Sequence, residues 1–463
     1  MKELGTGLAE ALGGVAPWLE AGDPTQMTIA RHMAGAFPIR GRVPRARRSH
    51  SSAIWNAFDT DLMQQDGTRS DAVSKSELIF DLAKLARRDG RLAIDTEFVS
   101  EGRYRPLLCL VQVALAPRGG SRGARIELLD PLRNGFDPGP LAEVLADPNV
   151  EVVFHAGAQD VAILKREWRV QPRNLFDTQV AAGFAGLGAQ TGYGTLLSRV
   201  LGTQLSKSAG FTRWDARPLT AEQLDYARSD VEELLALSDT LESRLDASGR
   251  LHWAREECRR LEDVSDERTP DEAYRRLPRV SQLRPRARAV ARALAEWREL
   301  TARSENRPVG SILSDVALVE IARRQPRSVQ QLQGIRGVRP DLGRRRGAAV
   351  LDVVAAGAEA DAPPVESWSR DGPDPNDAPR IALCEALLRQ RVSEAGLAYE
   401  LVASRADITE IVRAVREGGE PSGVRTLEGW RRELVGAELL DLLAGRLKLS
   451  TQPAGGVRVE REG

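Results

Sequence analysis

The 463-residue chain has few of the residues that build compact zinc or disulfide sites. It contains three Cys and four His, all scattered, and no pair of them has the spacing of zinc ligands. Three widely separated cysteines do not form a disulfide framework either. These absences exclude zinc-finger and disulfide-stapled classes, and they predict a protein of a reducing compartment, the cytoplasm.

Long apolar runs and net charge are lacking as well. No run reaches the roughly 18 residues that a membrane span needs, and the N-terminus has no compact signal-peptide pattern. The 66 basic and 66 acidic residues cancel, so bulk charge does not identify a nucleic-acid partner. Lysine is scarce, with six Lys against 60 Arg. Arginine suits phosphate binding, but genome base composition explains the same bias. We expect no membrane partner, and no protein partner is evident.

Residues 1–74 differ from the rest of the chain. They are rich in Gly, Ala, Pro and polar residues, contain all four Met and carry one basic cluster at 40–48. This composition predicts an N-terminal extension that is disordered, and a basic arm that touches nucleic acid is the alternative. The Met distribution also suggests Met63 as the true start, in which case residues 1–62 do not belong to the native protein.

Residues 75–246 alternate short strands with helices, which is typical of α/β or α+β domains. A helix is expected at 75–88. Strands are expected at 91–98, 107–115, 125–130 and within "VEVVFHAG", which the helix "AQDVAILKREW" follows. A Gly-rich hairpin loop, "PRGGSRG", joins the second and third strands. One long helix is expected over 219–245, with Thr220 as its N-cap and Gln223 at the capping-box position.

The rest of the chain is helical in pattern. Its expected parts are a connector at 247–282, a first helical domain at 283–357, a linker at 358–379, a second helical domain at 380–450 and a tail at 451–463. The two helical domains share a faint repeat at an offset of 90. Its matched positions are Ile312, Ser314, Leu318, Glu320, Ile321 and Arg323 with Val402, Ser404, Ile408, Glu410, Ile411 and Arg413.

Two carboxylates follow a strand-like apolar run, in the stretch "LAIDTEFVSEG". Asp95 and Glu97 are two residues apart, so on a strand both side chains face one way. Like charges this close repel each other, and a hard divalent cation such as Mg²⁺ or Mn²⁺ would offset the repulsion. A strand end that opens onto solvent is the alternative.

Two further acidic residues occupy positions from which they could join Asp95 and Glu97 in one site. Asp160 follows the strand "VEVVFHAG" in the first turn of a helix, where it also matches the helix dipole. Asp230 comes four residues after Tyr226, so the phenol and the carboxylate share one helix face. Taken alone, this pair is equally compatible with two polar residues on the surface of a helix that have no role in a site.

Together the four acids and the tyrosine resemble the DEDD exonuclease superfamily, in its tyrosine-bearing branch. The blocks "LAIDTEFVSEGRYRPLLCLVQVAL", "FHAGAQDVAIL", "LFDTQVAAGFAG" and "LSKSAGFTRWDARPLTAEQLDYARSDVEELLAL" look like those of the ribonuclease D family, as do the two helical segments. The resemblance covers about residues 75–450. It implies a ribonuclease-H-like α/β exonuclease domain, a mixed sheet flanked by helices, followed by two all-α HRDC-like domains. The second of them is the more divergent.

The resemblance also implies roles for the residues. Asp95, Glu97, Asp160 and Asp230 would hold two Mg²⁺ or Mn²⁺ ions, and Tyr226 would hold the attacking water and help to deprotonate it. We expect Tyr226 mainly to orient the water by a hydrogen bond. A tyrosine hydroxyl with an ordinary pKa of about 10 is a poor base by itself. The implied activity is a 3′–5′ exoribonuclease that trims extra 3′ residues from tRNA precursors and releases 5′-monophosphates.

A loop rich in basic residues, "SKSAGFTRWDARPL", precedes the long helix. Lys207, Arg213 and Arg217 surround Trp214, a combination that can hold a phosphate and stack a base. A lid that packs its tryptophan on the domain is the alternative. His155, in "FHAGAQD", is expected to be a hydrogen-bonded loop residue, and Asp177 a helix cap.

Two rival functions remain open at this point. The first is the same chemistry on DNA or on other small RNAs. The second is an RNA-binding adaptor that has lost catalysis, although all five residue types of the motif are intact.

Overall fold

The computed structural model describes residues 69–116, 124–205, 213–363, 374, 376–419, 421–453 and 455–461, with side chains from Glu77 onward. The expected basic arm and the expected start at Met63 lie outside the described residues. Helix α2 (Arg69–Asp89) starts six residues before the predicted position, inside the expected extension. No helix of the described residues is long and apolar enough to cross a membrane.

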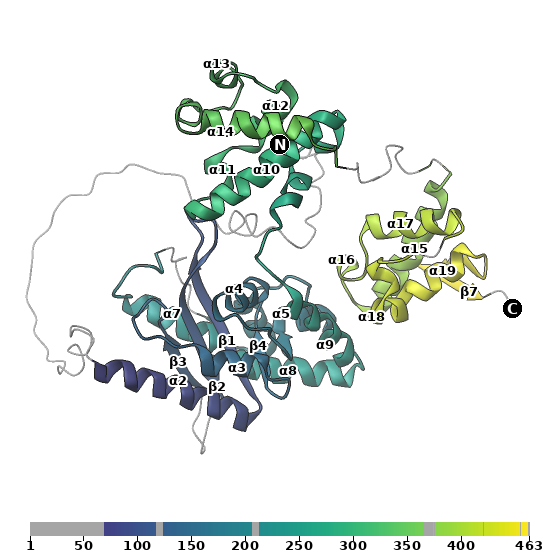
Figure 1. The fold of residues 1–463 in the computed structure, drawn as a ribbon. Helices are drawn as coiled ribbons and strands as arrows, with labels where there is room; N and C mark the ends of the chain where they lie inside the picture. Colours follow the sequence, from purple (N-terminus) through teal and green to yellow (C-terminus); the bar gives the residue numbers. More distant parts are fainter. Residues whose placement is uncertain are drawn as a thin grey trace, which may run out of the picture. The chain divides into compact units, whose positions relative to one another are not determined.

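A five-stranded mixed sheet forms the centre of the first domain (Figure 1). Its strands are β1 (Arg91–Val99), β2 (Leu107–Leu115), β3 (Arg125–Leu129), β4 (Glu151–Phe154) and β5 (Leu175–Asp177). They lie in the order β3-β2-β1-β4-β5. β1 pairs antiparallel with β2 and parallel with β4, so it is the central strand. The strands predicted at 91–98, 107–115 and 125–130 are therefore confirmed to within one residue, whereas the strand expected at 150–157 is shorter and β5 was not predicted.

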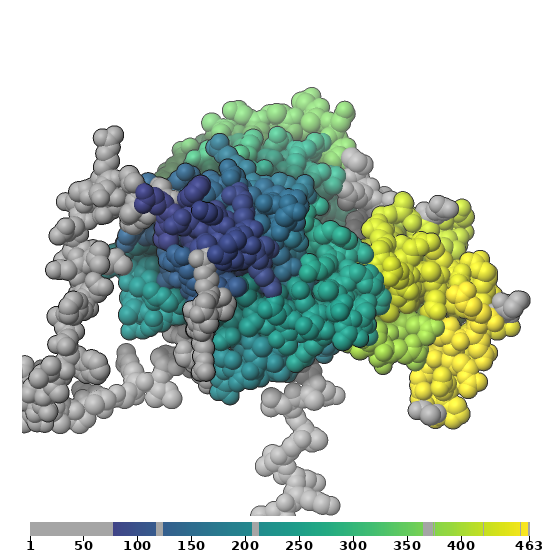
Figure 2. Space-filling view, turned by 90° about the horizontal axis from the view of Figure 1, so that it is seen from below, coloured from purple at the N-terminus to yellow at the C-terminus, as the bar shows by residue number. Residues whose placement is uncertain are grey.

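Helices cover the sheet and bury its apolar residues. Leu82 and Ala86 of α2 pack in one cluster with Leu92 and Ile94 of β1. The opposite face of α2 forms part of the outer surface, where its purple side chains are visible in Figure 2. The other helices are α3 (Gly139–Ala146), α4 (Ala158–Trp168), α5 (Thr178–Phe184), α6 (Tyr193–Leu196), η1 (Leu197–Leu201), α7 (Ala221–Glu232) and α8 (Leu234–Ala247). The expected mixed sheet flanked by helices is thus confirmed.

The single long helix predicted over 219–245 is wrong, because it is two helices. Thr220 caps α7, and the predicted capping box with Gln223 is present. The helix then breaks at Glu233, whose φ is −102°. Val231 packs on the sheet beside Ala93, whereas Leu237 of α8 belongs to another cluster with Phe184. α8 begins in the same cluster as Val231, through Leu234 and Leu235, and continues into the other one through Leu237 and Leu241.

Helices follow over the stretches expected for the connector and the first helical domain. The connector contains α9 (Leu251–Arg259) and the short helices η2 (Arg260–Asp263), η3 (Pro270–Arg276) and η4 (Val280–Gln282). The domain contains α10 (Pro285–Glu305), α11 (Val309–Ile312), α12 (Asp315–Arg324), α13 (Val329–Gln333) and α14 (Pro340–Glu359). Val290 and Leu294 of α10 are fully buried and form its core with Leu318 of α12 and Val350 of α14.

The second helical segment ends differently from the prediction. Its helices are α15 (Ala378–Ala395), α16 (Tyr399–Val402), α17 (Arg405–Arg416), η5 (Arg425–Leu427), α18 (Gly429–Arg431), η6 (Arg432–Gly436) and α19 (Ala437–Leu443). The expected tail instead takes part in a hairpin of β6 (Leu447–Thr451) and β7 (Val457–Arg461). Leu449 pairs with Val459 in it, and both positions belong to an apolar–polar alternation that the helical prediction overlooked.

The faint repeat corresponds to a repeat in the backbone. α11 begins at residue 309 and α16 at residue 399, and the two helices end at 312 and 402, so both bounds differ by 90 residues. Ser314 and Ser404, also 90 apart, cap the helices that follow. The preceding long helices end on left-handed residues at the same offset, Asn306 and Gly396. The two segments therefore share one helical arrangement over this stretch.

Candidate active site

The central strand β1 presents two carboxylates to one face of the sheet. Leu92, Ala93 and Ile94 are buried, whereas Asp95 and Glu97 are partly exposed. The register between β1 and β2 shifts after Glu97, so regular pairing is interrupted next to the pair. A bulge of this kind is frequent beside functional sites because it redirects side chains.

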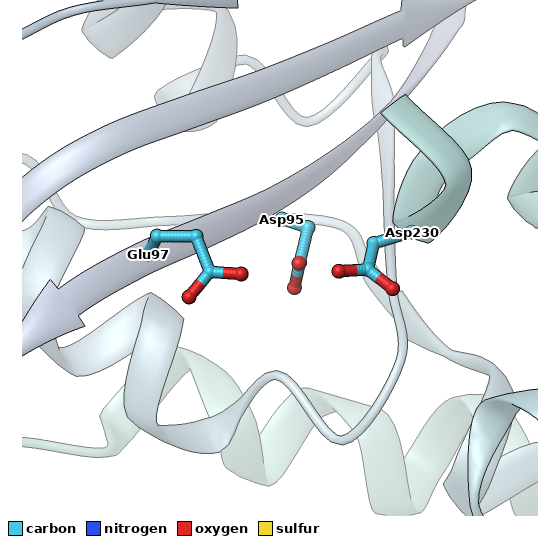
Figure 3. A group of neighbouring side chains, drawn as sticks. All are labelled: Asp95, Glu97 and Asp230. Carbon is cyan, nitrogen blue, oxygen red and sulfur yellow. The ribbon is translucent and has the colours of Figure 1, made fainter. Parts of the chain in front are cut away.

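A third carboxylate reaches this pair from helix α7. Asp95, Glu97 and Asp230 each offer an oxygen atom, and these atoms lie within 4.8 Å of one another. Figure 3 shows the three side chains pointing toward a common space between the strand and the helix. The structure thus brings together residues that are 133 positions apart in the sequence, from Glu97 to Asp230.

Burial and neighbouring charges disfavour ionisation at this cluster. Burial is the largest cause that raises the pKa of Asp95 well above its ordinary value. The negative charges of Asp160, Asp230 and Glu97 raise it further, in that order. The carboxylates therefore repel each other when all are ionised, and a cation placed between them would relieve that repulsion.

Asp160 lies close to this cluster but outside its tightest group. It is in the first turn of α4 and is buried, with 8% of its surface exposed. Its Oδ1 accepts a hydrogen bond from the hydroxyl of Thr96, the residue between the two β1 carboxylates. Its charge still acts on Asp95, so the four expected acids share one electrostatic environment.

The loop before α4 is held by a buried carboxylate, Asp177. Its two oxygens accept hydrogen bonds from the backbone N–H of Ala156 at 3.1 Å and of Gly157 at 2.8 Å. The same side chain caps α5 through Gln179 and Val180, so the predicted cap is confirmed. Ala156 has a φ of +55°, a conformation that costs energy for a residue with a Cβ. Asp177 thereby positions the turn from which Asp160 projects.

Two ring residues line the same loop. His155 Nδ1 lies 2.9 Å from the hydroxyl of Thr178, so the expected hydrogen-bonded loop histidine is confirmed. Its ring centroid is 5.4 Å from that of Tyr193, a residue for which the sequence predicted no role. Burial and the charge of Asp230 both raise the pKa of Tyr193. This hydroxyl therefore stays protonated beside the acidic cluster.

Tyr226 lies one helical turn before Asp230 on α7, as expected. Its ring centroid is 6.1 Å from that of Trp214, and the two rings are tilted by 37°. Both belong to a small cluster with Cys109, Leu110 and Ala227. The phenol is thus partly buried, with its ring direction fixed by packing.

The structure assigns two residues of the basic loop to packing. Trp214 is buried, with 3% of its surface exposed. Arg217 donates to both oxygens of Asp130 at 2.7 Å and to the carbonyl oxygens of Trp214 and Cys109. The base stacking expected of Trp214 and the phosphate contact expected of Arg217 are therefore unsupported, because both side chains are used inside the fold.

The other two basic residues of that loop are not part of this packing. Lys207 lies outside the described residues. Arg213 is 74% exposed and makes an ion pair with Asp215 at 3.0 Å. Its contact with RNA stays a prediction.

The donor set of the acidic cluster suits hard divalent cations. Carboxylate oxygens are the ligands that Mg²⁺ and Mn²⁺ prefer, and the three grouped oxygens are within the reach of one ion. No sulfur or imidazole ligand belongs to this group, which argues against zinc or copper. The residues therefore fit divalent metal use.

Two family models match the chain. Residues 71–246 match the model described as 3′-5′ exonuclease, and residues 287–354 match the HRDC domain. The first contains all four acids and Tyr226. The second covers most of the first helical domain.

Relatives resemble the chain over most of its length. The ribonuclease D of Sphingobium indicum is 36% identical over 372 residues, which cover 78% of this chain and 91% of that protein. The ribonuclease D of Granulibacter bethesdensis is 36% identical over 383 residues, covering 81% and 93%.

A solved structure agrees with these relatives. Escherichia coli RNase D, described as an exoribonuclease involved in structured RNA processing, matches with a TM-score of 0.70 at 29% identity. The match covers 80% of this chain and 97% of that one. With the acidic cluster at the expected place in the fold, the chain belongs to the ribonuclease D family of exoribonucleases.

Proposed function

We propose that this protein removes nucleotides one at a time from the 3′ ends of RNA and releases 5′-monophosphates. Its substrates would be tRNA precursors that carry extra 3′ residues. The observation that carries the proposal is the grouping of Asp95, Glu97 and Asp230, with oxygens within 4.8 Å, on an exonuclease fold. Other small stable RNAs remain the nearest alternative substrates.

Phosphodiester hydrolysis needs help because the backbone is anionic and repels a nucleophile. Two divalent cations, Mg²⁺ or Mn²⁺, would lower the pKa of the attacking water and stabilise the leaving oxygen when bound. Asp95, Glu97 and Asp230 would hold them, with Asp160, whose Oδ1 accepts the hydrogen bond from Thr96, as the fourth ligand. The mutual repulsion of these carboxylates favours cation binding as pH rises.

Tyr226 would orient the attacking water. It sits one turn from Asp230, and its ring contact with Trp214 limits how the phenol can move. A hydroxyl held in one direction can donate a hydrogen bond to a water molecule, or accept one from it, and so hold that water at a fixed position. None of these groups reads a base, so cleavage should depend little on nucleotide identity.

The C-terminal part would bind the body of the RNA. We propose that residues 380–450 form a second HRDC-like domain, which the shared offset of 90 between α11 and α16 supports. The boundaries 75–246, 283–357 and 380–450 are proposed with it. The three cysteines are free and buried, which fits a cytoplasmic location.

Nucleotide release from purified protein tests the proposal. A 3′-extended tRNA and a single-stranded DNA of equal length would be compared with Mg²⁺, with Mn²⁺ and with EDTA. We expect monophosphate release from the tRNA, its loss in EDTA, and slower cleavage of DNA.

The variant Asp95→Asn separates an enzyme from an adaptor. It should lose release while RNA binding is largely kept. A wild-type protein that binds RNA but releases nothing with either metal would instead be an adaptor, and the proposal would fail.

A further inference from the structure

A glutamine is buried without a partner beside the carboxylate cluster. Gln112 lies on β2, and 0% of its surface is exposed. Within the described part of the chain, neither its amide nitrogen nor its amide oxygen has a hydrogen-bond partner. Buried amides are nearly always hydrogen-bonded, because an unpaired one costs free energy. The neighbours of Gln112 show where a partner could come from.

Gln112 faces the same side of the sheet as Asp95. The two residues are directly opposite each other in the antiparallel pairing of β1 with β2. Opposite residues in such a pair project to one face, with Cβ atoms about 4.5–5.5 Å apart. A glutamine amide and an aspartate carboxylate can meet across this distance, because both groups extend beyond the Cβ atoms. The carboxylate of Asp95 is thus within reach of the Gln112 amide.

Apolar side chains surround Gln112 on its other sides. Helix α7 covers this face of the sheet, where Val231 packs in one cluster with Ala114. Gln112 comes two residues before Ala114 on β2, so both side chains face α7. The residue opposite Gln112 on β3 is Leu128. These side chains form no hydrogen bonds, so the carboxylate of Asp95 is the acceptor that the strand pairing places beside the amide.

An amide is suited to orient a carboxylate that binds a cation. Its nitrogen carries two N–H donors, and an ionised carboxylate only accepts hydrogen bonds. A lysine or arginine in this place would neutralise part of the negative charge that attracts the cation. The amide is uncharged, so it can fix the direction of the carboxylate and leave the charge of the cluster intact. Groups that hold a metal ligand in this way tune metal affinity without touching the metal.

We propose that Gln112 is a positioning residue, whose amide nitrogen donates a hydrogen bond to the carboxylate of Asp95 when that carboxylate binds a divalent cation. The inference rests on the proposed function, because it concerns the same carboxylate cluster. Gln112 is fully buried, so it does not touch RNA. It therefore sets the Mg²⁺ affinity and kcat and leaves the affinity for RNA unchanged.

The variant Gln112→Met tests the proposal, because methionine is also unbranched and flexible but has no N–H donor. The matched control is Leu115→Met on the same strand, since Leu115 packs with Leu92 in the cluster on the opposite face of the sheet. Titration calorimetry of the full-length protein measures Mg²⁺ affinity, and thermal melts in EDTA measure stability. Nucleotide release from a 3′-extended tRNA gives kcat and KM.

We expect Gln112→Met to lower Mg²⁺ affinity and kcat by about 10- to 100-fold, the usual loss when a group that holds a metal ligand is removed. KM for the tRNA should stay unchanged, since the amide contacts no RNA. In EDTA the variant should be at least as stable as the wild type, because an apolar side chain replaces an unpaired amide. The control should match the wild type in Mg²⁺ affinity and kcat.

A double variant shows whether Gln112 acts through Asp95. Asp95→Asn should weaken Mg²⁺ binding by itself, since it removes one charge of the cluster. Adding Gln112→Met to Asp95→Asn should then cost little further affinity, because changes to two partners of one contact are not additive. Fully additive losses would overturn the inference.

Two other results would overturn it as well. Wild-type Mg²⁺ affinity and kcat in a folded Gln112→Met protein would show that the amide does not hold Asp95. Lower stability of this variant in EDTA, with Leu115→Met unaffected, would show that the amide serves the fold itself. Failure of the proposed function is distinguishable, since the wild type would then release no nucleotide, while the Mg²⁺ affinities of wild type and variant still test the hydrogen bond.

Discussion

The carboxylate of Asp177 accepts a hydrogen bond of 2.8 Å from the backbone N–H of Gly157, and this bond connects the end of β5 to the turn that precedes α4. Four N–H groups converge on this side chain, which is 2% exposed. A Cβ on Gly157 would lie 2.5 Å from the Cβ of Phe154, so the turn has no room for a side chain at this position. The direction of Asp160 therefore depends on a residue that is not one of the expected metal ligands.

Replacing Asp177→Ala should lower both activity and stability. The change leaves four N–H groups without their acceptor and lets the strained turn at Ala156 relax. We expect a loss of about 1–3 kcal/mol in the free energy of unfolding and a larger than tenfold fall in kcat. Asp137→Ala is the control, because Asp137 accepts one exposed N–H at the start of α3. Wild-type kcat in a folded Asp177→Ala protein would contradict the positioning role.

Divalent cations should stabilise the protein more at pH 8 than at pH 5. The pKa of Asp95 is raised in the folded state, so the stability associated with this group is present at acid pH and lost as pH rises through the raised pKa. A cation bound among the ionised carboxylates offsets that loss. Thermal melts with Mg²⁺ and with EDTA at both pH values measure the difference.

The variant Asp95→Asn should shrink the stabilisation by Mg²⁺, since it removes one charge of the cluster. Sodium chloride at equal ionic strength controls for general screening. An equal Mg²⁺ shift at both pH values, or one that Asp95→Asn leaves intact, would argue against cation binding at these carboxylates.

Arg217→Gln should destabilise the protein without changing how RNA affinity depends on salt. Arg217 spans Asp130 and the carbonyl oxygens of Trp214 and Cys109, and hydrogen bonds to charged groups contribute about 1.5–3 kcal/mol. Chemical denaturation measures the loss. Arg213→Gln, on the exposed side of the same loop, is the matched comparison and should keep wild-type stability. A folded Arg217→Gln protein of normal stability and weak RNA affinity would restore the RNA-contact interpretation.

Glu257→Gln should destabilise the protein strongly at neutral pH and less in acid. Arg431 is 1% exposed and donates to both oxygens of Glu257, at 2.7 and 2.9 Å. Burial is the largest single influence and opposes ionisation of Glu257. The hydrogen bonds and charge of Arg431, the hydrogen bond from Trp430 and the charge of Arg260 together outweigh it and lower the pKa. The pair therefore stabilises the fold above the ordinary pKa of glutamate and loses that effect as pH falls through the lowered one.

Removal of one partner of a buried pair costs about 3–5 kcal/mol, because the other charge stays buried. Denaturation curves at pH 7 and near pH 3 give the two differences. Glu433→Gln is the control, because Glu433 is 61% exposed and accepts one bond from Trp253. A difference between wild type and Glu257→Gln that persists unchanged in acid would exclude the ion pair as its cause.

Local patterns predicted much of the fold and part of the site. The period of two along β1 predicts that Asp95 and Glu97 face one way, and the cap at Thr220 predicts where α7 begins. Only the resemblance to a family predicted that Asp230 would lie beside Asp95 and Glu97, because most of the domain's sequence separates helix α7 from strand β1. Local sequence patterns do not predict contacts between residues so far apart in the chain.

Other features depend on packing that the sequence does not display. The break at Glu233 has neither Gly nor Pro, so no residue type in the sequence signals it. Asp177 not only caps α5 but also accepts a hydrogen bond from Ala156, in the turn that follows β4 and not β5, and the local sequence does not predict this contact. The terminal hairpin was predictable in principle, since Leu447, Leu449, Val457 and Val459 alternate with polar residues around two glycines.

The spacing of 90 residues that parts of the two helical segments share has a consequence for which positions can vary. What the segments have in common is a serine at the start of a helix and a left-handed residue at the end of another, which are determinants of backbone path. Charged positions on their surfaces carry no such constraint, so mutation can alter them without unfolding the scaffold. Substitutions at such positions are therefore expected to change the surface chemistry of either segment and to leave its backbone path intact.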